Sequence, residues 1–71
     1  MTFYEALMIA MRHKGMKPAQ LCEKAGIYQS YISRLKSGKI KSVEWDKALA
    51  IIEALDMTPN DFLAIQRSDQ S

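Results

Sequence analysis

The 71-residue chain has few of the residues that cross-link very small proteins. It contains one cysteine, Cys22, and one histidine, His13, so an intramolecular disulfide is excluded and no group of residues has zinc-ligand spacing. Three glycines and two prolines leave little material for long loops. No apolar run approaches the about 18 residues of a membrane span. A single small hydrophobic core must therefore stabilise the chain, which buries only about 60% of its unfolded surface.

The sequence also lacks the features of exported proteins and of most enzymes. The N-terminus "MTFYEALMIAMRHKG" has neither the charged start nor the small-residue cleavage site of a signal peptide, so we expect a cytoplasmic protein. No nucleophile–base pair, carboxylate pair or metal-ligand group can be recognised, and we expect neither catalysis nor a cofactor. We interpret Cys22 as a small buried residue and not as a redox switch.

Charge is present, but it is distributed unevenly. The net charge is only +2, yet residues 1–41 contain eight Lys or Arg and two acids, whereas residues 42–71 contain two Lys or Arg and six acids. The halves therefore carry +6 and −4. Such asymmetry favours a first half that faces a polyanion, although solvated charges in chance imbalance would look the same.

Apolar spacing and capping residues predict five short helices and no strand. Thr2 with Glu5 forms a capping box before the first helix, and Thr58 with Asp61 forms one before the fifth. Ser42 is the expected cap of the fourth helix. The remaining boundary signals are Pro18 and Pro59 at helix starts, and Gly15, Gly26, Gly38 and Asp56 at helix ends.

The second and third predicted helices are joined by a short segment that contains Gly26, which is the helix-turn-helix arrangement. Counted from Pro18, the fifth residue is the small Cys22 and the ninth is Gly26, which can adopt positive φ. Positions that must face inward are all apolar: Leu21, Ala25, Ile27, Ile32 and Leu35. We also expect Tyr28 to share the inner sector with Ile32 and Leu35, because the three recur at helical spacing.

The segments "KGMKPAQLCEKAGIYQSYISRLKSGK" and "ALAIIEALDMTPNDFL" resemble the phage-repressor type of helix-turn-helix protein, the Cro/cI or XRE-like family. The resemblance covers about residues 7–63. It implies an all-α, compact five-helix lambda-repressor-like domain over residues 1–67, with a frayed tail at 68–71. It further implies a sequence-specific regulator that binds double-stranded DNA, nucleoid-associated in a prokaryotic cell. We expect no small-molecule ligand, and the short apolar runs predict no membrane association.

The resemblance and the chemistry of DNA grooves assign roles to the third helix. Its leading residues should reach base edges in the major groove. We expect four residues to read bases: Gln29, Ser30, Ser33 and Arg34. Gln29 suits adenine, while Arg34 could reach guanine or a phosphate. We expect five residues at the DNA backbone: Lys17, Tyr31, Lys36, Lys39 and Lys41. Tyr31 could instead touch a thymine methyl group.

Three positions depart from the family pattern. Lys17-Pro18 stands where Thr-Gln is frequent, Tyr28 where a Ser or Thr cap is common, and Asp56 where Gly is usual. Without a capping hydroxyl at Tyr28 we expect the third helix to lose about 1 kcal/mol.

A repressor of the Cro or cI kind would bind a palindromic operator as a homodimer, because one small domain reads too few base pairs. We expect the dimer interface in the acidic half, at Leu55, Met57, Phe62 and Ile65. Trp45 is interpreted as core packing in the fourth helix, with an interface anchor as the alternative. The alternative function is a protein-interaction module on the same fold, either an antitoxin or an adaptor for another regulator.

Overall fold

The computed structural model of the chain describes residues 2–68 and contains five helices in that range, with no strand. The helices are α1 (Phe3–Lys14), α2 (Pro18–Ala25), α3 (Gln29–Ser37), α4 (Trp45–Ala54) and α5 (Pro59–Arg67). The all-helical class and the number of helices agree with the sequence prediction. Ser68 closes α5, and the rest of the predicted frayed tail lies outside the described residues.

Side-chain caps begin α1 and α5 where the sequence predicts them. Thr2 accepts a hydrogen bond of 3.2 Å from the Glu5 N–H, and Glu5 Oε1 accepts one of 3.0 Å from the Thr2 N–H. Thr58 and Asp61 exchange the same pair at α5. The predicted cap of α4 is wrong. The helix begins at Trp45 with Glu44 in the cap position and without a side-chain capping bond. Ser42 precedes it in the connecting segment.

Four of the five helices are followed by a residue in the left-handed conformation: Gly15, Gly26, Asp56 and Gly38. Gly26 has φ of +71° and follows α2, and the Ile27 N–H then donates to the Cys22 carbonyl at 3.0 Å. Asp56 has φ of +59°, a conformation that Asp tolerates better than most side chains but that still strains it. Both turns therefore occur where the sequence predicts them.

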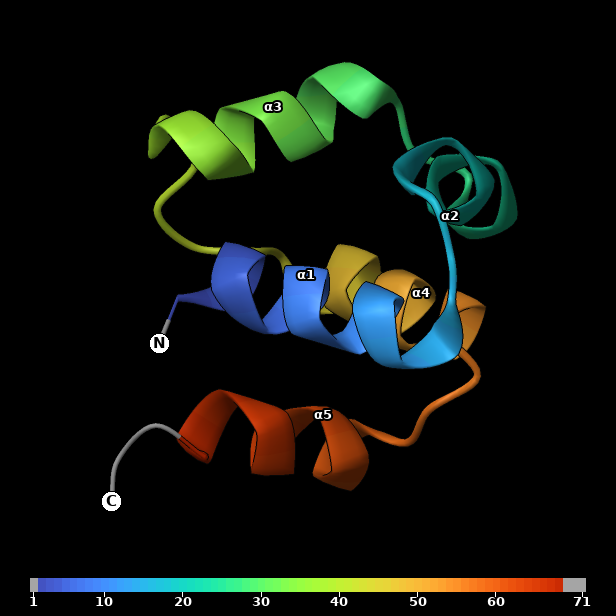
Figure 1. Ribbon diagram of the computed structural model, residues 1–71. Coiled ribbons are helices and arrows are strands. Elements are labelled where there is room, and N and C mark those ends of the chain that lie inside the picture. The colour runs from blue at the N-terminus through green and yellow to red at the C-terminus, as the bar shows by residue number, and fades with distance from the viewer. Residues whose placement is uncertain (1, 69–71) are drawn as a thin grey trace.

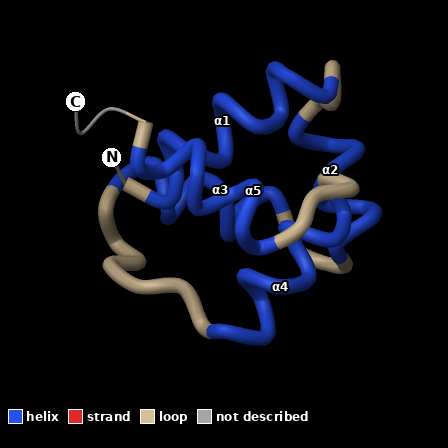
Figure 2. The backbone as a smooth tube through the Cα atoms, turned by 90° about the horizontal axis from the view of Figure 1, so that it is seen from below, coloured by secondary structure: helices blue, strands red, loops and turns tan. Residues whose placement is uncertain are grey.

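The five helices form three levels (Figure 1). α1 and α4 lie in the middle, α3 lies on one side of them, and α5 lies on the opposite side. α2 packs against α4 at one end, and α1 packs against α5. A long loop leads from α3 to α4 and passes the start of α1 (Figure 2). The arrangement leaves the outer face of α3 uncovered.

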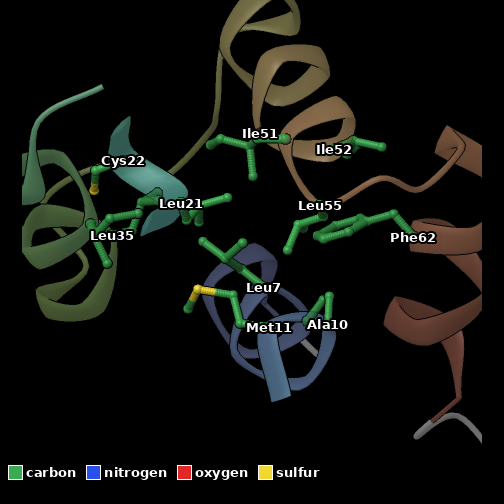
Figure 3. Close-up of a cluster of buried hydrophobic side chains, with 13 residues drawn as sticks. Leu7, Ala10, Met11, Leu21, Cys22, Leu35, Ile51, Ile52, Leu55 and Phe62 are labelled. Atoms are coloured by element: carbon green, nitrogen blue, oxygen red, sulfur yellow. The ribbon is translucent and has the colours of Figure 1, made fainter. Parts of the chain in front are cut away.

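The core lies between the five helices, and α3 contributes Ile32 and Leu35 to it (Figure 3). Its five fully buried large side chains are Leu7, Leu21, Ile51, Leu55 and Phe62. The Phe62 ring also packs against Phe3 with a centroid distance of 5.0 Å.

Two predictions of burial are wrong. Trp45 is 69% exposed, although it continues the apolar face of α4. Tyr28 is 83% exposed. It is the cap residue of α3 with an extended backbone (φ −92°, ψ 150°), so helical spacing does not place its side chain.

Candidate nucleic-acid interface

The α2–turn–α3 unit has the geometry that a helix-turn-helix requires. Only Gly26, Ile27 and Tyr28 separate the two helices. Leu21 and Cys22 of α2 and Ile32 and Leu35 of α3 are all buried in the core. Ala25 and Ile27, the other two inward positions, are half-buried against the same core. The inner surface of α3 is thus fixed by packing, and its outer surface is fixed in orientation as a consequence.

The outer surface of α3 brings the four predicted base-reading residues together. Gln29, Ser30, Ser33 and Arg34 are all exposed. Residues three and four apart share one face of a helix, so these side chains form a single stripe. Within the described part of the chain, none of the four side chains is engaged by a hydrogen bond or ion pair. The stripe therefore offers unpaired amide, hydroxyl and guanidinium donors to a partner outside the chain.

The predicted backbone-contacting lysines lie at the margins of this stripe. Lys36, Lys39 and Lys41 are exposed at and beyond the end of α3, where positive charge also complements the helix dipole. Lys17 is exposed at the start of α2, and its N–H donates to Gln20 Oε1 at 2.9 Å. The Lys17 backbone is thereby fixed, while its ammonium group extends into solvent.

Tyr31 is placed differently from its neighbours. Its ring is half-buried against the core, and the Lys47 ammonium nitrogen lies 4.5 Å from the ring centroid. Burial raises the pKa of the Tyr31 hydroxyl, and the nearby Glu44 carboxylate adds to the effect. One face of the ring is thus covered by Lys47, and the ring packs on the core.

Sequence reasoning missed Lys47 as a neighbour of α3. Lys47 belongs to α4 and is surrounded in sequence by acids, so the sum of charges over residues 42–71 hides it. Only the packing of the α4 start beside α3 brings it to Tyr31, and no local pattern in the sequence indicates that contact.

A second surface feature adjoins the far end of α3. Trp45 and Leu63, 40% exposed, line an apolar groove of about 860 Å³. The end of α3, the following loop, the start of α1 and one side of α5 complete its walls. Leu55 and Phe62, expected at a dimer interface, have 0% and 2% of their surface exposed and belong to the core. Met57 and Ile65 are half-buried against it.

Other chemistry finds little support in the described residues. No group of three or more His, Cys, Asp or Glu among residues 2–68 is placed to hold a metal ion. Cys22 is 6% exposed, and burial raises the pKa of its thiol, which makes the nucleophilic thiolate scarcer. Over the same range, none of the helices combines the length and the apolar character needed to traverse a lipid bilayer.

The fold and the exposed α3 stripe define a helix-turn-helix DNA-binding domain. The family model of the Cro/C1-type HTH DNA-binding domain matches residues 6–68. The chain therefore belongs to this family, as the sequence motif predicted. Neither a curated protein nor a solved structure matches the chain.

Proposed function

We propose that the protein is a transcriptional repressor of the Cro or cI kind that binds a palindromic operator as a homodimer. The observation that supports this most is the α3 stripe, where four polar side chains stand exposed and unpaired on a helix whose other face is locked into the core. A helix of this kind fits the major groove, which distinguishes all four base pairs by their donors and acceptors.

Within the proposal, base reading and backbone contact are separate tasks. Gln29 and Ser30 lead the helix and Ser33 and Arg34 follow one turn later, so these four read base edges. Gln29 pairs with adenine N6 and N7, while Arg34 pairs with guanine or holds a phosphate. The exposed lysines at positions 17, 36, 39 and 41, together with the Tyr31 hydroxyl, hold the backbone and set the register.

A homodimer follows from the size of the domain. One module of this size reads few base pairs, whereas two copies on one DNA face read two half-sites about 34 Å apart. The molecule measures 33 × 25 × 20 Å, so its longest dimension is comparable with one helical turn of DNA.

We place the dimer interface at the Trp45–Leu63 groove, to which Phe62 contributes only a small exposed part and Leu55 contributes nothing. The groove carries most of the exposed apolar surface outside the α3 start, and it includes the end of α3 itself. A two-fold axis at the groove would therefore lie on the side of the trailing ends of both α3 helices. To enter two successive major grooves, the outer faces of both helices must lie on the same side of the dimer. Met57 and Ile65 can contribute only their exposed parts.

The test is selection of bound duplexes from a random DNA pool, followed by measurement of affinity against salt. We expect a palindromic winner that recurs upstream of the protein's own gene. With about five phosphate contacts per subunit, log Kd should rise with log salt with a slope of about 9, since each contact releases counterions. A shallow slope together with no preferred sequence would refute the proposal.

The exposed groove also favours a second candidate function, an adaptor or antitoxin that binds another protein through Trp45 and Leu63. The two candidates differ in their need for α3. If no duplex is retarded even at low salt, while a purified protein partner binds and Trp45→Ala abolishes that binding, the adaptor is the correct function.

A further inference from the structure

Tyr28 is the most exposed of the large hydrophobic side chains in residues 2–68, at 83%. It occupies the position directly before Gln29, the first residue of α3. The extended backbone at this cap position takes its side chain out of the helical stripe and away from the core. A large aromatic ring therefore stands in solvent at the leading end of the proposed recognition helix.

Folding does not account for the choice of residue. The Tyr28 side chain makes no capping hydrogen bond with α3, although its carbonyl accepts one of 3.0 Å from the Tyr31 N–H. Serine or threonine at this position would accept a hydrogen bond from an otherwise unpaired helix N–H. Tyrosine thus gives up a cap and gains no burial within the chain. Within residues 2–68 nothing covers most of the ring, so only a partner molecule could bury it.

The position limits what that partner can be. If Gln29 and Ser30 point at base edges, the adjoining Tyr28 ring lies against the same groove. The major groove presents one apolar group, the C5 methyl of thymine. Stacking on a base is excluded in an intact duplex, and a phosphate contact would need only the hydroxyl and leave the apolar ring exposed. Tyr31, the other aromatic of α3, is withdrawn because it packs on the core with Lys47 over its ring.

We propose that the Tyr28 ring contacts the C5 methyl group of a thymine adjacent to the base pair that Gln29 reads, and so determines part of the operator sequence. The inference rests on the proposed function, because it requires α3 in a major groove. Burying one methyl-sized group corresponds to about a fourfold change in affinity for each half-site. The contact is uncharged, so it should contribute equally at low and high salt.

The experiment uses the full chain and the duplex selected from a random pool, with each thymine replaced singly by deoxyuridine in both half-sites. Deoxyuridine removes only the methyl group. For the native chain we expect one thymine per half-site whose replacement weakens binding, by about fourfold for one half-site and about sixteenfold for both. The other thymines of the duplex are the internal controls.

Three variants identify the group responsible. Tyr28→Phe keeps the ring and should keep the full deoxyuridine effect. Tyr28→Ser and Tyr28→Ala should bind the thymine duplex about as weakly as the native chain binds the deoxyuridine duplex, and should not distinguish the two. Tyr28→Ser should also raise Tm by about 4 °C, because it restores a cap. A more stable protein that binds more weakly separates a DNA contact from a structural role.

Different results overturn different claims. If no duplex is selected, both the proposed function and the Tyr28 contact are wrong. If a duplex is selected but contains no methyl-sensitive thymine, only the Tyr28 contact is wrong. The same conclusion follows if Tyr28→Ser keeps the native sensitivity, or if Tyr28→Phe loses it, since the hydroxyl and not the ring would then make the contact.

Discussion

The two ends of α3 differ in how they expose an aromatic ring. At the leading end, the exposed Tyr28 ring adjoins the exposed polar side chains of α3. At the trailing end, Trp45 joins Leu63 and the walls of an apolar groove. An isolated ring among hydrogen-bonding groups suits a surface that is mostly polar, such as a DNA groove. A ring within an apolar patch suits a protein surface, since the buried centres of protein interfaces are apolar and enriched in aromatic residues.

The comparison teaches that exposure alone does not define a role. Tyr28 and Trp45 are 83% and 69% exposed, yet their neighbours point to different partners. α3 is only nine residues long, so the two surfaces are separated by about 13 Å along its axis. A change at one end should therefore leave the other end unaffected.

The largest effect is expected where an apolar residue belongs to the core and not to either surface. Phe62→Ala should lower the free energy of unfolding by about 3–5 kcal/mol, because it leaves a cavity beside Leu55 and Phe3. Its neighbour in sequence, Leu63→Ala, should lower it by only about 0.5 kcal/mol, since that side chain lies at the surface. Urea denaturation monitored by circular dichroism measures both changes.

Phe62→Leu provides a variant that still folds if the alanine variant does not. It should lie between the native chain and Phe62→Ala in stability. If Phe62→Ala weakened dimerisation but kept its full unfolding free energy, Phe62 would belong to an interface and not to the core.

At the groove, Trp45→Ala should weaken dimerisation by about 2 kcal/mol or more, a roughly 30-fold increase in the dimer Kd, because buried aromatic anchors dominate interface energies. The unfolding free energy of the monomer should hardly change, since Trp45 is largely exposed. Sedimentation equilibrium over a range of protein concentrations gives the dimer Kd.

Trp45 is the only tryptophan, so its fluorescence reports on the same event. Emission of the native chain should shift to shorter wavelength as concentration rises and the ring is buried. Tyr28→Ala serves as the control at the other end of α3, and should dimerise like the native chain in the absence of DNA. If Trp45→Ala and Tyr28→Ala weakened dimerisation equally, the two ends of α3 would not have separate roles.

Much of this architecture could be predicted from the sequence, because local chemistry determines it. The Thr2–Glu5 and Thr58–Asp61 boxes need only residues three apart, and Gly26 and Asp56 adopt positive φ where the chain must turn. The seven helix-turn-helix positions are likewise constrained jointly by one short crossing of two helices. Periodicity then predicts which faces are buried.

Periodicity fails where a residue lies at the edge of an element. Tyr28 lies in the cap, where helical phase does not apply, and Trp45 lies in the first turn of α4, where its side chain stays 69% exposed. An apolar pattern also cannot tell whether a face is buried by its own chain or by a second copy. For this reason Leu55 and Phe62 were expected at an interface and instead lie in the core.

Within the α3 stripe, the proposed division between reading and holding gives a smaller effect. Gln29→Ala should weaken binding to the selected operator by about 1–3 kcal/mol and relax preference at one base pair. Lys39→Ala should weaken binding to all sequences about equally and reduce the salt slope by about one. Fluorescence anisotropy on operator and scrambled duplexes at several salt concentrations separates the two outcomes. Identical behaviour of the variants would mean that the division is wrong.

The smallest effect is expected for the contact between Lys47 and the Tyr31 ring. Lys47→Met should lower the unfolding free energy by about 0.5 kcal/mol, because an ammonium group near an aromatic face is only weakly stabilising at a surface. Lys47→Arg, which retains the positive charge over the ring, is the matched control.

The hydroxyl of Tyr31 offers a more sensitive readout of this pair. Burial and Glu44 already raise its pKa, so the folded chain holds the proton more tightly than the unfolded chain. The protonated Tyr31 hydroxyl therefore makes its full contribution to the free energy of unfolding below the unfolded pKa of about 10. This contribution is lost as pH rises through the folded pKa. Removing the positive charge of Lys47 should raise the Tyr31 pKa further, whereas Lys47→Arg should not. Ultraviolet titration measures this pKa. If the Lys47→Met variant and the native chain had the same Tyr31 pKa, Lys47 would not lie over the Tyr31 ring in solution.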